Sequence, residues 1–174
     1  MNRGPGSQDD QYRNAADKFG PAIARLARGY EADTELRRDL EQEIHAALWR
    51  SFAYFEEQCS LRSWVYRIAH NVAVTHIQRG RRIRGEGLQT LEATEELAAS
   101  DNPEAETAEA QLVARLLATI HRLAPADRQV MLLYLEDLTA AEIGEVTGLS
   151  ATAVSSRIHR LKALLAKPYL EKEI

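Results

Sequence analysis

Residues 60–84 read SLRSWVYRIAHNVAVTHIQRGRRIR, and this stretch decides the fold because it combines a helical apolar pattern with dense positive charge. Its large apolar residues recur at spacings of three and four, which places them on one face of an α-helix: Leu61, Trp64, Val65, Ile68 and Val72. Six arginines and no acidic residue accompany them. The stretch therefore predicts either a helix that binds an anionic partner or an ordinary amphipathic helix with a solvated basic face.

The composition of the whole chain limits the class of protein and the compartment in which it works. The 174 residues suffice for one compact domain or two small ones, and a formal net charge of −4 conceals separate basic and acidic blocks. Cys59 is the only cysteine, which excludes a disulfide framework and is typical of a reducing cytoplasm. The polar start lacks a signal peptide, and no apolar run is long enough to cross a membrane, so we expect a cytoplasmic protein without membrane insertion.

The N-terminal part predicts two helices before the basic stretch. Residues 1–10 are expected to be disordered, and a helical pattern then runs from Tyr12 to Tyr30. Gly20-Pro21 interrupts it, which predicts a kink or a helix that starts near Pro21. The second helix has Asp33 or Thr34 as its N-cap and an apolar face at steps of four: Leu36, Leu40, Ile44, Leu48 and Phe52. Its opposite face is charged and is expected either to be solvated or to dock a partner.

An acidic segment separates the chain into two parts. Residues 86–110 contain eight acidic residues, no basic residue and few large apolar side chains, so they cannot bury enough surface to fold alone. We interpret residues 85–104 as a flexible linker. From residue 105 a helical pattern resumes, which predicts a second, smaller helical domain. The fold class is therefore all-α, with two small helical domains joined by an acidic linker.

The end of the chain predicts a helix-turn-helix. Pro125 marks a helix start, and Thr139 with Glu142 matches the capping box at the start of a short helix. Gly148 supplies the turn, and Gly144 is the small residue that two closely crossing helices require. Ser150 can cap a last helix whose inward residues are Val154, Ile158, Leu161 and Leu165. Its outward residues include no acid, which suits phosphates and base edges, although a plain helical hairpin is the alternative.

These segments together resemble the extracytoplasmic-function sigma factors, the smallest class of sigma-70 subunits of bacterial RNA polymerase. The resemblance rests on RDLEQEIHAALWRSF from Arg38, CSLRSWVYRIAHNVA from Cys59, and the stretch from Leu123 to Leu165. It implies sigma region 2 at residues 11–84 and sigma region 4 at residues 105–170. It also implies core RNA polymerase as partner, through the clamp helices of the largest subunit and the flap of the second-largest, together with promoter DNA and an anti-sigma factor.

The resemblance assigns three sets of residues. Those expected to dock on the polymerase clamp are Asp39, Leu40, Gln42 and Glu43. Those expected to read the minus-ten element or grip its phosphates are Phe55, Gln58, Cys59, Ser60, Arg62, Ser63, Trp64, Arg67, His70, Asn71, Arg79, Arg81 and Arg82. Those expected to read the minus-thirty-five element as duplex are Ser150, Thr152, Ala153, Ser155, Ser156, Arg157, His159, Arg160 and Lys162.

Three positions depart from the family pattern, and two other classes of protein compete with it. His45 stands where an aromatic residue is usual, Thr147 where a larger apolar residue is common, and Ser155 where a basic residue is frequent. We find no zinc-protease, phosphate-loop or Ser/His/Asp pattern, so we expect no enzyme, cofactor or metal. The other competitor is a stand-alone helix-turn-helix regulator with an N-terminal sensor or dimerisation domain.

Overall fold

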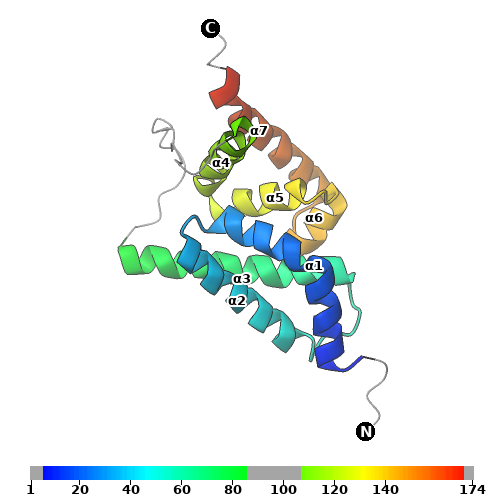
Figure 1. Ribbon diagram of the computed structural model, residues 1–174. Coiled ribbons are helices and arrows are strands. Elements are labelled where there is room, and N and C mark those ends of the chain that lie inside the picture. Colours follow the sequence, from blue (N-terminus) through cyan, green and yellow to red (C-terminus); the bar gives the residue numbers. More distant parts are fainter. Residues whose placement is uncertain (1–5, 86–106, 171–174) are drawn as a thin grey trace. The chain divides into compact units, whose positions relative to one another are not determined.

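The computed structural model describes residues 6–85 and 107–170, and these residues form α-helices joined by short turns (Figure 1). They divide into two compact units: α1, α2 and α3 belong to the first, and α4, α5 and α7 to the second. The all-α, two-unit architecture agrees with the sequence prediction. Residues 1–5 and 86–104, predicted to be disordered and to form a linker, lie outside the described residues.

Helix α1 (Gln8–Tyr30) begins earlier than expected and bends in its middle. Ser7 and Asp10 form a capping box, with the Ser7 hydroxyl accepting from the Asp10 amide and the Asp10 carboxylate from the Ser7 amide. Residues 8–10 are therefore helical, which corrects the prediction of disorder up to residue 10. The two halves of α1 run in different directions, and Pro21 lies inside the helix, so the predicted kink is observed instead of a later start (Figure 1).

Helices α2 (Thr34–Ser51) and α3 (Leu61–Arg84) pack against each other and against α1. Asp33 is the N-cap of α2, where its carboxylate accepts from the amides of Glu35 and Leu36. Leu40, Ile44 and Leu48 are fully buried as predicted, whereas Leu36 in the first turn is 41% exposed. These three side chains form the contribution of α2 to a core that α1 and α3 complete with Phe19, Ile23 and Val65, among others.

The buried face of α3 is displaced by about one residue from the predicted one. Of the five predicted apolar positions only Val65 is buried, and the other four are half-buried. The residues that face α1 and α2 most completely are Val65, Tyr66, Ala69, His70, Ala73 and Ile77. They keep the spacing of three and four that identified the helix. The helical spacing was therefore predicted correctly, but the predicted buried stripe lies about one position away from the observed one.

The second unit begins with α4 (Ala108–His121) and α5 (Pro125–Leu135), which starts at Pro125 as predicted. Ile120, Val130, Met131 and Leu133 are buried in its core, while Leu112 and Val113 in the early turns of α4 are exposed. The guanidinium of the buried Arg128 donates to the main-chain carbonyls of His121 and Leu123. A basic group at the carboxyl end of a helix is favourable, so Arg128 fastens the end of α4 to α5.

Helices α6 (Ala140–Thr147) and α7 (Ala151–Leu170) form the predicted helix-turn-helix. Thr139 and Glu142 make the capping box, and the Ser150 hydroxyl accepts from the Ala153 amide at 3.1 Å. Gly148 has a φ of +79°, which glycine adopts readily. A Cβ on Gly144 would lie 2.6 Å from the Leu149 carbonyl oxygen, so only glycine allows this close approach. Val154 and Leu161 are fully buried, and Ile158 and Leu165 are half-buried.

Candidate functional site

The turn between α2 and α3 is held in shape by its own side chains. The Gln58 amide accepts from the Glu56 main-chain N–H at 2.8 Å and donates to the Tyr54 carbonyl at 3.3 Å. The Ser60 hydroxyl caps α3 by accepting from the Ser63 amide at 3.0 Å. Gln58, Ser60 and Ser63, predicted as minus-ten readers, therefore have structural roles in positioning the turn and the start of α3.

Glu57 has the least usual backbone of this turn. Its φ of +57° lies in the left-handed region, which costs a non-glycine residue on the order of 1 kcal/mol. Such conformations persist where the surrounding structure fixes them, and they are enriched at functional sites. Here the two hydrogen bonds of Gln58 fix the residues on both sides of Glu57.

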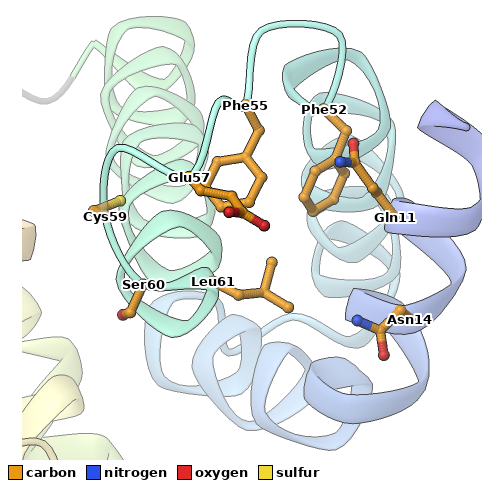
Figure 2. Close-up of a pocket in the computed structure, with 8 residues that line it drawn as sticks. All are labelled: Gln11, Asn14, Phe52, Phe55, Glu57, Cys59, Ser60 and Leu61. Carbon is orange, nitrogen blue, oxygen red and sulfur yellow. The ribbon is translucent and has the colours of Figure 1, made fainter. Parts of the chain in front are cut away.

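A pocket of about 390 Å³ opens beside this turn. Figure 2 shows the side chains around it, drawn from the first half of α1, the end of α2 and the turn into α3. Its lining residues are Gln11, Asn14, Phe52, Phe55, Glu57, Cys59, Ser60 and Leu61. The lining combines apolar side chains with amide, hydroxyl, thiol and carboxylate groups.

Three aromatic rings support one side of the pocket. Phe55 lies between Phe52 and Trp64, with ring centroids 5.8 and 5.1 Å away, and the Trp64 indole N–H donates to the Ser51 hydroxyl at 3.0 Å. These distances are typical of aromatic pairs that stabilise a core. Of the predicted minus-ten residues, the structure thus brings Phe55, Cys59 and Ser60 to the pocket, while Trp64 packs behind Phe55.

His70 was predicted to contact DNA, and this prediction was wrong. Its side chain is fully buried, and its Nδ1 lies 2.6 Å from the Tyr30 hydroxyl. Burial lowers the pKa of His70 to about 3, so the ring is neutral at physiological pH. Nothing in the residue type indicated burial, because its partner Tyr30 lies forty positions earlier in the chain.

The other predicted minus-ten residues lie along α3. Asn71, Arg79 and Arg82 are exposed, and Arg62, Arg67 and Arg81 are half-buried. The Arg79 guanidinium donates to the Glu43 carboxylate at 3.2 Å, and His76 lies 3.9 Å from the same carboxylate. Glu43 was predicted to dock on polymerase and Arg79 to grip DNA, so two residues assigned to different partners are paired with each other.

The predicted docking residues of α2 separate into two groups. Asp39 and Gln42 are exposed, and Glu43 is half-buried beside Arg79. Leu40 is 0% exposed and belongs to the core, which corrects its assignment as a docking residue. Because α2 turns by about 100° per residue, Leu40 points inward between Asp39 and Glu41, whereas Gln42 lies on the outer side.

Helix α7 presents most of the predicted duplex-reading residues to solvent. Thr152, Ala153, Ser155, Ser156, His159, Arg160 and Lys162 are exposed, as is the capping Ser150, and Arg157 is half-buried. Helix α7 contains no acidic residue. The Lys162 ammonium lies 3.3 Å from the Tyr134 hydroxyl and 5.3 Å from the centre of its ring.

One acidic residue that the sequence reasoning missed organises this surface. The Asp127 carboxylate on α5 accepts from Arg160 Nη2 at 3.2 Å and lies 3.4 Å from Arg157 Nε. Asp127 on α5 therefore holds together two of the predicted DNA-binding arginines on α7, two helices later in the sequence. No local signal pointed to it, because the contact joins residues more than thirty positions apart.

Within the described ranges 6–85 and 107–170, no group of three or more histidine, cysteine, aspartate and glutamate side chains could hold a metal ion. Nor is any helix in these ranges both long and apolar enough to cross a membrane.

The chain matches the family models of Sigma-70 region 2 over residues 16–83 and of Sigma-70 region 4 over residues 114–165. It is 30% identical to the RNA polymerase sigma factor CnrH of Cupriavidus metallidurans, over 86% of this chain and 81% of CnrH. It is 34% identical to the ECF RNA polymerase sigma factor SigE of Mycolicibacterium smegmatis, over 95% of this chain and 62% of SigE. The region 2 match goes against a sensor or dimerisation domain in the N-terminal half.

A solved structure agrees with the fold. The structure of CnrH in complex with the cytosolic domain of CnrY has a TM-score of 0.67 with this chain at 24% identity, covering 97% of this chain and 92% of CnrH. Together with the two family matches and the sigma factor relatives, the likeness leads to one conclusion. The chain belongs to the extracytoplasmic-function sigma factors of the sigma-70 family.

Proposed function

We propose that this sigma factor directs core RNA polymerase to promoters by reading the minus-thirty-five element as duplex and capturing an unpaired base of the minus-ten element. The pocket beside the α2–α3 turn carries the proposal. A protein that reads only duplex DNA has no need of such a pocket next to a basic helix. A protein that opens DNA needs one, because a base taken out of the stack must find new stacking and polar contacts.

The energetics of opening explain why the pocket and α3 belong together. Each base-pair step that is opened loses about 1.4 kcal/mol of stacking. Phe52, Phe55 and Leu61 offer apolar walls for the captured base, and the polar groups around them can bind its edge. Asn71 and Arg82 are exposed on α3, where they are available to the neighbouring strand and its phosphates.

Helix α7 supports the other half of the proposal. Its exposed hydroxyl, histidine and basic side chains suit the donors and acceptors of the major groove, and its lack of acid avoids repulsion by phosphates. Ser155 and Ser156 carry no charge, so contacts from them add little to the salt dependence of binding. Arg157 and Arg160 reach the same surface but share the Asp127 carboxylate.

The proposed partners follow from the family and from α2. Asp39 and Gln42 form the exposed part of the surface that we assign to the clamp helices of the largest polymerase subunit, and we assign the second unit to the flap of the second-largest subunit. CnrH has been solved with the cytosolic domain of CnrY. We extend this kind of partner to the present chain as an anti-sigma factor that competes with core polymerase.

A transcription assay on a randomised promoter library tests the proposal. The purified chain is added to core RNA polymerase, and the templates that give transcripts are sequenced. We expect two enriched sequence blocks at a fixed spacing, with the downstream block dependent on Asn71. Enrichment of a single palindromic block, independent of polymerase, would instead indicate a stand-alone dimeric regulator.

A further inference from the structure

The pocket has a wall that the family match does not include. Gln11 and Asn14 line it from the first half of α1, whereas the match to Sigma-70 region 2 starts at residue 16. In Figure 2 both amides lie across the opening from the turn that carries Glu57. The N-terminal turns of α1 thus add two amide groups, each both donor and acceptor, to a pocket otherwise built by the turn and by Phe52.

This wall is anchored and is not a fraying helix end. The Gln8 side-chain amide donates to the Trp49 carbonyl at 2.7 Å, and the Trp49 indole N–H donates to the Asp9 carboxylate at 2.8 Å. The Tyr12 hydroxyl lies 3.0 Å from His45 Nδ1. These contacts tie three residues in the first two turns of α1 to α2. They also give a role to His45, which replaces the aromatic residue usual at its position.

The opposite wall presents a carboxylate. Figure 2 shows the Glu57 side chain directed into the pocket between Phe55 and Leu61. Its left-handed backbone, fixed by the neighbouring Gln58, sets this direction. An ionised carboxylate only accepts hydrogen bonds, so it favours a ligand edge that donates. It also disfavours a phosphate, which indicates that a base edge and not the backbone occupies this side.

We propose that Glu57, Gln11 and Asn14 determine which base the pocket holds, favouring an unpaired base with an exocyclic amine over thymine. This inference rests on the proposed capture of a minus-ten base. Adenine, cytosine and guanine each offer an amine that can donate to Glu57, whereas thymine offers two carbonyls beside a single ring N–H. The two amides on α1 supply the paired donor and acceptor that an amine and its neighbouring ring nitrogen require.

The test uses the holoenzyme and a fork-junction DNA whose minus-ten region is single-stranded on the non-template strand. An abasic scan first finds the captured position, and the four bases are then compared there by binding affinity. We expect thymine to rank last, by roughly tenfold, the size of one hydrogen bond to a charged group. Glu57→Gln should reduce this penalty to about twofold, because an amide also donates to carbonyls.

Matched variants separate the pocket from general electrostatics. Glu56→Gln removes the same charge from the neighbouring position, which does not line the pocket, so the base ranking should stay as in the wild type. The double variant Gln11→Ala and Asn14→Ala should weaken binding of the preferred bases without changing core polymerase affinity. Suppose that the abasic scan identifies a captured position, but that neither Glu57→Gln nor the double variant changes the base ranking there. This result would overturn the present inference and leave the proposed base capture intact. No abasic-sensitive position anywhere would overturn the proposed base capture itself.

Discussion

His70 illustrates how a single residue can look functional in sequence and be structural in the fold. It lies on the helix that carries the basic residues, yet it is buried against Tyr30 and Tyr66. Its Nε2 has no hydrogen-bond partner within the described residues. A neutral ring is therefore required, since a buried unpaired charge would cost several kcal/mol.

The lowered pKa of His70 predicts how stability depends on pH. Because the pKa is about 3 in the folded state and near 6.5 when unfolded, the unfolded chain binds an additional proton between these values. The stabilising contribution is complete above pH 6.5 and declines as the pH falls toward 3, by up to about 1.4 kcal/mol per pH unit. His70→Gln lacks this pH-dependent contribution to stability. The free energy of unfolding of the variant should therefore fall less steeply than that of the wild type between pH 6.5 and 4.5. Equal slopes in denaturant titrations of the two proteins would contradict the assignment.

Asp127 gives a second prediction at the residue scale. Asp127→Asn should lower the preference of the holoenzyme for an intact over a scrambled minus-thirty-five element. The expected loss is at least about fivefold, because Arg157 and Arg160 must then be ordered on binding at about 0.5 kcal/mol or more each.

The matched control for Asp127 is Asp137→Asn. Asp137 is exposed and has a φ of +58°, a conformation that asparagine tolerates, and the same charge is removed from the same unit. Filter-binding affinities on the two promoters measure the preference for all three proteins. A preference that falls equally in both variants would show that net charge, and not the positioning of the arginines, is responsible.

At the scale of elements, the helix-turn-helix depends on one close approach. Gly144→Ala would place a Cβ 2.6 Å from the Leu149 carbonyl oxygen, a backbone atom that cannot move aside cheaply. We expect a loss of about 1–3 kcal/mol of stability, as for overpacked cores, measured by denaturant unfolding.

Gly80→Ala on α3 is the comparison for Gly144→Ala. The nearest atom there is the end of the flexible Arg84 side chain at 3.4 Å, and alanine is the better helix former, so stability should stay equal or rise by about 0.5–1 kcal/mol. A Gly144→Ala variant as stable as Gly80→Ala would show that the turn can relax.

Helices of this kind could be predicted from sequence where local chemistry decides them. The Asp33 cap, the capping box of Thr139 and Glu142, and the start at Pro125 all involve residues within four positions of each other. The buried face of α3 was displaced because spacing fixes a helical period but not which of two adjacent stripes meets its neighbours. His70 was misassigned for the same reason, since only packing shows which side points inward. Leu40 was misassigned by the resemblance, although its spacing had already placed it on the apolar face.

The candidate site was less predictable because it is assembled from distant segments. Phe55, Cys59 and Ser60 were expected at the minus-ten site, and they do line the pocket. Gln11 and Asn14 line it from the half of α1 that is tied to α2 by the hydrogen bonds of Gln8 and Asp9 with Trp49. Neither hydrogen bond leaves a local pattern in the sequence, because each joins residues about forty positions apart.

At the scale of the whole molecule, the acidic and basic residues are distributed unevenly among the helices. Helices α3 and α7, the two assigned to DNA, carry basic residues and no acidic residue, although the net charge of the chain is −4. Binding depends on the local field at each surface, so an acidic protein can present two cationic helices. Because each helix contacts only part of a promoter, we expect weak binding by the free chain and strong binding once polymerase holds both units on one DNA.

Run-off transcription tests this central claim most directly. The free chain and its complex with core RNA polymerase are compared on a promoter enriched from the randomised library, in parallel with a gel-shift assay on the same duplex. The account predicts initiation from one start site only when chain and core polymerase are both present, and poor binding of the duplex by the free chain. Tight sequence-specific binding by a free dimer, with no effect on transcription by core polymerase, would contradict it.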